Sequence, residues 1–274
     1  MDVSQGLLQS LLQSINDYLI IKDKDGTILY YNKVHPTFLC LGNGIFYDQE
    51  QHFYTYETSK TIFQGKEYQM EQFKDITDLY REMKELETDH TTGLPNKKRL
   101  FAELNALNKK KTKYHIAMID VDDFKAVNDT FGHPFGDSIL RTIADTFQYY
   151  ITNSTFVGTG KEFVGRYGGE EFTMIFREEE LETVLEKLDF LRKQIIQNIA
   201  YRFNKTLVTI SIGLASSHDF TTDSLGQLAE ADRILYYVKQ HGKNAVGYQN
   251  QITKEIELYE EQQVEVKKEK KFTI

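Results

Sequence analysis

Two glycines followed by two glutamates lie between two short apolar runs in the second half of this 274-residue chain. These residues are Gly168, Gly169, Glu170 and Glu171. Glycine adopts positive φ at little steric cost, so a Gly-Gly pair between apolar runs predicts a tight β-hairpin. This hairpin would hold a carboxylate at its turn. Taken alone, the pattern fits a hairpin without chemical function equally well.

A second segment, residues 116–125, is an apolar run that ends abruptly in acids, the first of which is Asp120. Mg²⁺ prefers oxygen ligands and is commonly bound by one or two carboxylates together with substrate phosphates. Acids at a strand end are also often ordinary solvated loop residues, so this segment leaves both interpretations open. If Asp120 lies beside the hairpin, the acids can share metal ions that bind the attacking and leaving oxygens of a nucleotidyl transfer.

Composition narrows the classes of function. The formal net charge of −8 argues against a nonspecific nucleic-acid binder, because affinity for polyanions comes largely from Lys and Arg. The single cysteine, Cys40, excludes an intrachain disulfide and a cysteine-rich zinc site, and we interpret it as a packing residue. No segment reaches the about 18 consecutive apolar residues of a membrane helix, and residues 1–13 lack the basic flank of a signal peptide. We expect a cytoplasmic protein with no membrane span and no nucleic-acid partner.

The length favours two domains, and the second, residues 89–250, shows mixed periodicity. We predict helices over 96–109, 137–150, 179–199 and 224–241. We predict strands over 114–121, 163–167, 171–176, 207–214 and 245–248. Strands mixed with helices, including one tight hairpin, indicate an α+β fold with the helices on one face of a sheet.

Residues 1–74 form a smaller predicted α+β domain. Apolar residues at helical spacing over 7–15 predict a short amphipathic helix. Two apolar runs, 18–21 and 27–31, flank an Asp-Gly pair and predict a hairpin. The aromatic-rich runs 45–56 and 61–73 supply further strands.

The two domains are joined by a predicted helical linker, residues 75–88. Ile76, Leu79, Met83 and Leu86 follow an a/d spacing, as in a coiled coil. The seam spans only about two heptads, so an ordinary packed linker helix remains an alternative. Residues 251–274 are densely charged, and we expect a solvated helix or disorder there, with no assigned function.

The hairpin motif Gly168 to Phe172 resembles the signature of the GGDEF-domain diguanylate cyclases, in its GGEEF form. Four other segments agree with this family at compatible spacing: 89–96, 120–137, 209–213 and 231–244. The resemblance therefore covers about 160 residues in five ordered motifs. It implies a nucleotidyl cyclase domain with a ferredoxin-like palm. The implied reaction is the Mg²⁺-dependent condensation of two GTP molecules into cyclic di-GMP and two pyrophosphates.

The resemblance also implies the roles of the acids. Asp120, the Val121 carbonyl, Glu170 and Glu171 match the metal-binding positions, which hold Mg²⁺ or Mn²⁺. Glu170 also resembles the residue that activates the 3′-hydroxyl, so Asp120 and Glu170 are the expected catalytic residues. An alternative is a catalytically silent module that holds GTP to regulate a partner. The retained acids speak against it.

Substrate-binding roles follow from the same resemblance. Asn128 and Asp137 match positions that read the guanine edge, and His133 matches another substrate contact. A carboxylate can accept hydrogen bonds from guanine N1–H and its amino group, although Asp137 could instead cap a helix beginning at Ser138. Some relatives that make other cyclic dinucleotides carry serine at this position, so Asp137 favours guanine.

Triphosphate contacts are expected from two groups. Main-chain N–H groups around Phe124 and Lys125, where the backbone turns into a helix, suit an anion. Lys239 and Lys243 resemble the family's triphosphate-binding pair, although arginine is common at the second position.

Two departures from the family pattern have consequences. Thr91 stands where leucine is usual, a packing change. The family's product-inhibition motif, Arg-x-x-Asp, falls on residues 159–162, which read Thr-Gly-Lys-Glu. Because the arginine is absent, we predict that feedback inhibition at this site is weak or missing.

Residues 16–77 resemble a short PAS domain through two brief motifs, which implies a sensor of an unidentified signal. His35 and His52 do not by themselves indicate a haem or metal site, because isolated histidines are usually surface or core residues. In the family, each cyclase domain holds one GTP, so catalysis implies a homodimer. The seam of residues 76–86 is a candidate dimer stalk.

Overall fold

The computed structural model describes residues 17–32, 36–42, 44–154, 157–204, 206–216 and 224–260. The chain forms two compact units, residues 1–86 and 87–274, and their boundary falls inside the predicted linker. The predicted helix over 7–15, His35 and the lysine-rich end of the tail lie outside the described residues. No helix in the described part of the chain is long and apolar enough to cross a membrane.

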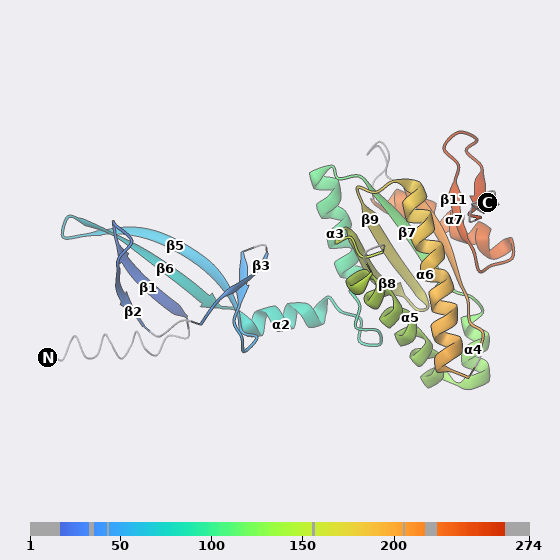
Figure 1. Ribbon diagram of the computed structural model, residues 1–274, viewed down its shortest axis with the longest axis horizontal. Coiled ribbons are helices and arrows are strands. Elements are labelled where there is room, and N and C mark those ends of the chain that lie inside the picture. The colour runs from blue at the N-terminus through green and yellow to red at the C-terminus, as the bar shows by residue number, and fades with distance from the viewer. Residues whose placement is uncertain are drawn as a thin grey trace, which may run out of the picture. The chain divides into compact units, whose positions relative to one another are not determined.

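The N-terminal unit is built on one antiparallel sheet with the strand order β2-β1-β6-β5-β4-β3 (Figure 1). Its strands are β1 (Tyr18–Asp23), β2 (Ile28–Tyr31), β3 (Leu39–Gly42), β4 (Ile45–Tyr47), β5 (Phe53–Phe63) and β6 (Lys66–Asp75). The predicted hairpin around Asp25-Gly26 is confirmed, because β1 pairs with β2 and Gly26 has φ of 85°. Aromatic rings pack on this sheet, with Phe38 stacked on Phe73 at a centroid distance of 4.0 Å.

Three details of this sheet differ from the sequence prediction. The run 45–56 forms two strands rather than one, because residues 48–52 separate β4 from β5, which pair with each other. Residues 61–63 belong to the same long strand as residues 53–60, and the chain reverses only at Gln64-Gly65, where both residues have positive φ. Strand β3 was not expected, because its four residues, Leu-Cys-Leu-Gly, are too few to show a period. Between β1 and β6, the described residues contain no helix.

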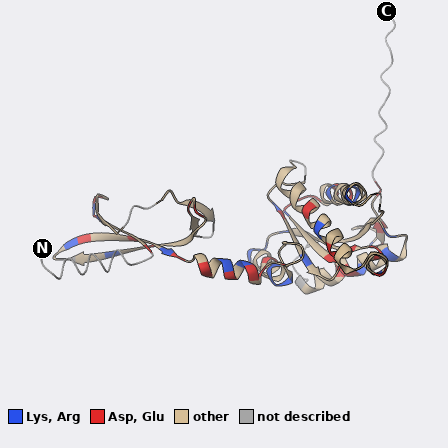
Figure 2. Ribbon diagram, turned by 90° about the horizontal axis from the view of Figure 1, so that it is seen from below, with Lys and Arg blue, Asp and Glu red and all other residues tan. Residues whose placement is uncertain are grey.

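Helix α2 (Thr77–Leu86) follows β6 directly. Its start is fixed by Asp75, whose Oδ1 accepts a hydrogen bond from the Thr77 N–H at 2.8 Å, and by Tyr80, whose ring stacks on Phe53 at 4.1 Å. Figure 2 shows acidic and basic residues along this helix. The predicted seam residues Leu79, Met83 and Leu86 are 50–58% exposed, so the described residues of the N-terminal unit do not cover this apolar face.

The C-terminal unit contains a six-stranded mixed sheet with the order β12-β11-β10-β7-β9-β8 (Figure 1). Its strands are β7 (Tyr114–Val121), β8 (Glu162–Gly168), β9 (Glu171–Arg177), β10 (Ile210–Ser216), β11 (Val246–Gln249) and β12 (Ile256–Leu258). Its helices are α3 (Lys97–Lys110), α4 (Phe124–Phe131), α5 (His133–Asn153), α6 (Leu181–Arg202) and α7 (Ser224–Gln240). Among the strands that the structure describes in this sheet, β10 and β11 alone are parallel neighbours, and the predicted α+β class is confirmed.

Helices cover both faces of this sheet, and the prediction of helices on one face is wrong. The core on one face includes Phe147 of α5 and Leu188 of α6. The core on the other face includes Leu104 of α3 and Leu235 of α7. Strand β7 lies between them and is buried at all eight positions, as expected of a strand covered on both sides.

Helix α7 lies against the backbone of β10 at Gly213. A Cβ atom added to Gly213 would overlap the backbone atoms of Ala231 and Leu235. The absence of a side chain therefore allows the helix to approach the strand closely, as glycine permits where two backbones meet.

Three further elements differ from the prediction. Helix α4 was absent from the helices predicted by periodicity, although the family resemblance implied a helix start at Phe124 and Lys125, where α4 begins. Helix α5 begins at His133 rather than at residue 137, with Pro134 in its first turn. Strand β12 pairs with β11, so residues 256–258 are neither a solvated helix nor disordered. Asp137 lies within α5, one turn after its start, and the alternative in which it caps this helix is therefore wrong.

Candidate active site

The end of β7 brings the predicted acids together. Asp120 is the second-last residue of β7, is 6% exposed, and lies opposite Glu171 of β9 in the sheet register. The Val121 N–H donates to the Glu170 carbonyl at 3.4 Å, which attaches the hairpin turn to the same strand end. Asp120 and the two glutamates thus lie at the same end of two neighbouring strands, β7 and β9, in the interior of the sheet.

The hairpin turn is held by Arg166, which the sequence reasoning did not single out. Gly169 has φ of 53°, in the left-handed region that glycine tolerates. The Arg166 guanidinium donates to the Gly169 carbonyl at 2.6 and 3.0 Å and to Asp89 Oδ1 at 2.8 Å. Although burial acts to raise the pKa of Asp89, hydrogen bonds from Arg166 and Thr92 hold that pKa below its ordinary value.

The site carries more negative charge than its basic residues balance. Burial raises the pKa of Asp120, the Lys239 ammonium opposes this effect, and the neighbouring Glu170 carboxylate adds to it. Burial likewise raises the pKa of Glu171, and the charges of Asp120 and Asp232 act in the same direction. These shifts follow from crowded carboxylates, each of which disfavours the ionised form of the others.

Lys239 of α7 supplies the positive charge closest to the buried aspartate. Its Nζ lies 2.8 Å from Asp120 Oδ2. A cavity of about 300 Å³ opens beside Lys239 and Glu171, and its remaining wall comes from α7, including Asp232 and Tyr236. The predicted partner, Lys243, lies beyond the end of α7 and forms an ion pair with Asp123 at 2.7 Å.

Asp122 is a structural member of the site that sequence reasoning gave no role. It is 6% exposed, and its carboxylate accepts hydrogen bonds from the Thr209 and Ser211 hydroxyls, both at 2.6 Å. It also accepts the Asn244 N–H at 3.1 Å. Asp122 therefore connects the ends of β7 and β10 to the loop that carries Lys243. The presence of Thr209 and Ser211 among the matched motifs was the signal that could have revealed it.

The residues predicted to bind the base form a second group on α4 and α5. Asn128 lies on α4, Asp137 is half-buried on α5, and His133 is exposed at the first position of α5. The Asn128 Oδ1 atom is buried without a hydrogen-bond partner within the described structure. A Cβ atom at Gly136 would overlap this oxygen, so glycine leaves the space in which it sits.

Helix α4 links this second group to the acids. Asp123, with φ of 55°, precedes α4, and the helix begins at Phe124, with Lys125 exposed in its first turn. The first N–H groups of a helix lack intrahelical partners, so the amides at Phe124 and Lys125 have the character of an anion site.

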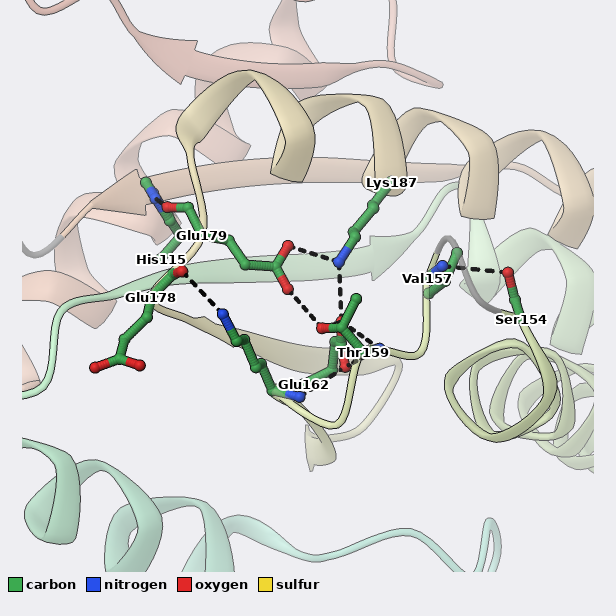
Figure 3. A network of polar contacts seen from close by, with 9 residues as sticks. His115, Ser154, Val157, Thr159, Glu162, Glu178, Glu179 and Lys187 are labelled. Carbon is green, nitrogen blue, oxygen red and sulfur yellow. Dashed lines mark hydrogen bonds and ion pairs between the residues drawn. The ribbon is translucent and has the colours of Figure 1, made fainter.

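The segment that aligns with the product-inhibition motif is folded into a buried ion cluster (Figure 3). The Glu162 side chain is fully buried and accepts hydrogen bonds from Lys187 Nζ at 2.9 Å and from the Thr159 N–H. Lys187 is itself 1% exposed and contacts Glu179 Oε2 at 2.6 Å. The cluster joins the start of β8 to the segment after β9, at the base of the hairpin. The Glu162 carboxylate is therefore already bound to Lys187 and Thr159 inside the fold.

The oxygen donors at the ends of β7 and β9 can be compared with the ligands that Mg²⁺ prefers. Among the described residues, no three His, Cys, Asp or Glu side chains are placed to hold a metal ion by themselves. These strand ends instead offer the Asp120, Glu170 and Glu171 carboxylates with one ammonium, Lys239, on the buried one. These oxygen donors carry negative charge that one ammonium group does not balance. They therefore fit a Mg²⁺ ion that takes its remaining ligands from a bound substrate.

Comparison with known proteins places this geometry in a family. Residues 86–245 match the family described as diguanylate cyclase, GGDEF domain. The chain is 36% identical over 145 residues to diguanylate cyclase A of Treponema denticola, covering 52% of this chain and 37% of that protein. It is 30% identical over 175 residues to a diguanylate cyclase of Vibrio cholerae, covering 62% of this chain and 52% of that protein. The chain thus spans between about a third and about half of the length of these curated relatives.

A solved structure agrees with the fold. The coiled coil and GGDEF domain of DgcB from Caulobacter crescentus, in complex with c-di-GMP, has a TM-score of 0.55 at 28% identity. The match covers 62% of this chain and 90% of that one. Since the family match extends over more than half of the sequence and contains the acids at the end of β7, the chain belongs to the diguanylate cyclase, GGDEF domain, family.

Proposed function

We propose that this protein is a Mg²⁺-dependent diguanylate cyclase that condenses two GTP molecules into cyclic di-GMP and two pyrophosphates. The observation that supports this most directly is the meeting of Asp120 with the Glu170-Glu171 pair at the end of β7. The alternative of a silent GTP-binding module requires none of these acids, whereas all three are retained and are electrostatically coupled.

Asp120, Glu170, Glu171 and the Val121 carbonyl would hold the metal. Bound Mg²⁺ lowers the pKa of a coordinated hydroxyl and compensates the charge that develops on phosphate oxygens. Glu170, at the exposed turn, accepts the proton of the 3′-hydroxyl. The 3′-oxygen then forms a bond to the α-phosphorus of the second GTP, and the bond from that phosphorus to the pyrophosphate oxygen breaks. This step occurs twice for each product molecule.

The base pocket is proposed to recognise guanine. The buried Asn128 Oδ1 is an acceptor without a partner in the described structure, and such atoms carry a cost that a ligand N–H can remove. The Asp137 carboxylate, on the adjacent turn of α5, can accept from N1–H and the amino group of guanine, and His133 lies at the start of the same helix. Adenine presents neither N1–H nor that amino group.

The triphosphate is proposed to bind between the first turn of α4 and the two lysines. Amide groups at Phe124 and Lys125 would donate to phosphate oxygens. Lys239 and Lys243 now pair with Asp120 and Asp123, and a phosphate can replace these carboxylates as their partner. Lys243 offers a point charge where an arginine would offer a bidentate contact.

The N-terminal unit is proposed to act as a PAS-like sensor that controls a cytoplasmic homodimer. The two GTP molecules must meet face to face, because each domain holds one of them. The exposed apolar residues of α2 suit a helix that pairs with its copy in a second chain. The six-stranded antiparallel sheet in front of this helix is consistent with the PAS-like resemblance, and its signal is not identified by the sequence.

The α2 seam gives one prediction. The double substitution Leu79→Glu and Met83→Glu is expected to weaken dimerisation by more than about 100-fold, because four apolar side chains lose their burial in each dimer. Cyclase activity at low protein concentration should disappear, while binding of a non-hydrolysable GTP analogue is retained. Sedimentation equilibrium and a product assay measure the two effects.

The matched control is Arg81→Gln with Lys84→Gln, which changes the charge of α2 by the same amount without touching the seam. Loss of dimer in this control, or full activity of the seam variant as a monomer, would count against the dimer stalk.

The buried cluster at residues 159–162 gives a second prediction. Because no arginine is present and Glu162 is bound to Lys187, added cyclic di-GMP should not slow the reaction through this segment. The measurement is the initial rate as a function of added product. Tight product binding by the full chain that is lost in Lys161→Ala would contradict it.

The reaction itself is tested by incubating the purified protein with GTP and MgCl₂ and identifying the products by mass spectrometry. Cyclic di-GMP is expected, with no product when EDTA replaces Mg²⁺ and none from ATP in a parallel reaction. GTP binding without turnover by a verified dimer would favour the silent regulatory module. A mixed or adenine-containing product would contradict the role assigned to Asp137.

A further inference from the structure

A cavity of about 370 Å³ lies in the N-terminal unit, where β4, β5 and β6 meet the loop at residues 48–52. Its volume is within the range of small-molecule sites in proteins, which is about 300–1,000 Å³. The described lining combines carboxylates, amide and imidazole groups with aromatic rings: Tyr18, Pro36, Asp48, Gln49, Glu50, His52, Tyr54 and Asp75.

The lining is acidic and contains no lysine or arginine. Asp48, Glu50 and Asp75 contribute three carboxylates, and none of them pairs with a lysine or arginine among the described residues. Asp48 is 4% exposed and is held by the Tyr54 hydroxyl at 3.0 Å and by the His52 N–H at 2.9 Å. The basic group among the lining residues is the His52 imidazole, whose Nδ1 lies 3.2 Å from Asp48 Oδ2 and 3.8 Å from Glu50 Oε2. Three carboxylates beside one imidazole leave the lining with an excess of negative charge, which favours a cationic occupant.

The aromatic side chains indicate which kind of cation fits. Tyr18 and Tyr54 lie edge to face at 5.5 Å, and Phe38 packs against both rings. Aromatic rings beside carboxylates attract organic ammonium groups through the ring quadrupole. A bare metal ion is a poorer fit, because the described carboxylates and His52 do not form a group placed to bind one.

We propose that this cavity binds a small organic cation, with its ammonium group toward the Glu50 and Asp75 carboxylates and its carbon skeleton against Tyr18 and Tyr54. The inference deepens the proposed sensor role by naming the ligand class. The binding itself is measured without GTP, so its failure and the failure of the cyclase assignment are distinguishable.

The cavity shares residues with the start of α2. Asp75 lines the cavity, and its Oδ1 accepts the Thr77 N–H that begins the helix. The Thr77 hydroxyl in turn accepts the N–H of Phe53, whose ring stacks on Tyr80. A cation that orders Asp75 therefore stabilises the first turn of α2, and amide hydrogen exchange over residues 74–82 should slow when the ligand binds.

The test uses the full chain and isothermal titration calorimetry with choline, putrescine and tyramine. At least one of these cations is expected to bind with a dissociation constant below about 1 mM, which corresponds to a modest small-ligand affinity. The neutral control is 3,3-dimethyl-1-butanol, which has the shape of choline without its charge, and it should bind at least tenfold more weakly than choline if choline binds. MgCl₂ alone serves as the metal control.

Two variants locate the site. Glu50→Gln and Asp75→Asn remove charge while keeping shape, and asparagine can still cap α2. Each should weaken the binding cation at least fivefold. The control is Glu57→Gln, an exposed carboxylate on β5 outside the cavity lining, which should leave the affinity unchanged.

Several results would overturn the proposal. The first is the absence of any heat of binding when each of the three cations is titrated to about 10 mM, well above the expected dissociation constant. The second is that 3,3-dimethyl-1-butanol binds as tightly as choline. The third is that Glu57→Gln weakens cation binding as much as the two cavity variants do. Binding of Mg²⁺ that is lost in both cavity variants would replace the organic cation with a metal. The proposal is supported if a cation binds, if Glu50→Gln and Asp75→Asn each weaken that binding while Glu57→Gln does not, and if the cation slows amide hydrogen exchange over residues 74–82.

Discussion

Replacement of Glu170 by glutamine is expected to lower the rate of cyclic di-GMP formation by about 10³-fold, within the range for loss of a general base and metal-binding carboxylate. The amide keeps the shape of the side chain but neither accepts the 3′-hydroxyl proton as a base nor offers a negative charge. Initial rates under saturating GTP and MgCl₂ measure the loss. Asp120→Asn should act in the same direction.

Glu186→Gln is the matched control, because Glu186 is an exposed carboxylate on α6 away from the ends of β7 and β9. It should retain the parent rate. Both site variants should still bind a GTP analogue through the base pocket. A parent-like rate for Glu170→Gln, in protein shown to be folded, would remove the hairpin acid from the reaction.

Replacement of Lys187 by methionine is expected to destabilise the C-terminal unit by about 3–5 kcal/mol, the usual cost of removing one partner from a buried ion pair. Glu162 and Glu179 would keep their charges in a buried site with no ammonium between them. Urea unfolding followed by circular dichroism gives the change in free energy. Lys193→Met is the control on the same helix, since Lys193 is 42% exposed and its ion pair with Asp189 should contribute about 1 kcal/mol or less.

Adding Glu162→Gln to Lys187→Met should recover part of the lost stability, because the amide needs no counter-charge. The effect should also depend on pH. Although burial acts to raise the pKa of Glu162, hydrogen bonds from Lys187 and Thr159 lower it to about 2, from an ordinary value of 4.5. A lowered pKa contributes stability above the unfolded value and loses it as pH falls. The difference between parent and Lys187→Met should therefore shrink between pH 4.5 and pH 2, and a constant difference would contradict this account.

The centre of the C-terminal unit could be predicted from the sequence because its signals are local. The β7 strand is an uninterrupted apolar run that ends in acids, and its predicted and observed limits agree. The diglycine turn between β8 and β9 was equally clear. Recognition of the family motifs then named the acids, whose convergence depends on strand pairing over about 50 residues of sequence.

Other features depend on contacts that a local pattern does not contain. The prediction placed the helices on one face of the sheet, although an uninterrupted apolar run such as β7 is typical of a strand covered on both faces. The number of helices on each face is a property of the whole sheet. Helix α5 begins four residues before its predicted start at residue 137, and Pro134 in its first turn was a sequence signal of this start that the prediction overlooked. Strand β12 consists of three residues in a charged segment and is recognisable only through its pairing with β11.

Arg166 and Lys187 were also missed because their partners are distant in the sequence. Arg166 acts on a carbonyl three residues away and on Asp89, which is 77 positions earlier in the chain. Lys187 reads as one charged residue of an amphipathic helix, and its partners lie 25 and 8 positions away. A buried lysine is rare enough that only the assembled core reveals it.

The contact of α7 with Gly213 limits the distance between Lys239, the proposed triphosphate ligand, and the acids at the end of β7. Main-chain atoms, rather than side chains that could be exchanged, separate the helix of Lys239 from the strand next to Asp120. Repacking elsewhere in the core can therefore alter stability while this spacing persists. A single methyl group at Gly213 would overlap the backbone of α7 and would shift Lys239 relative to Asp120 and Glu171.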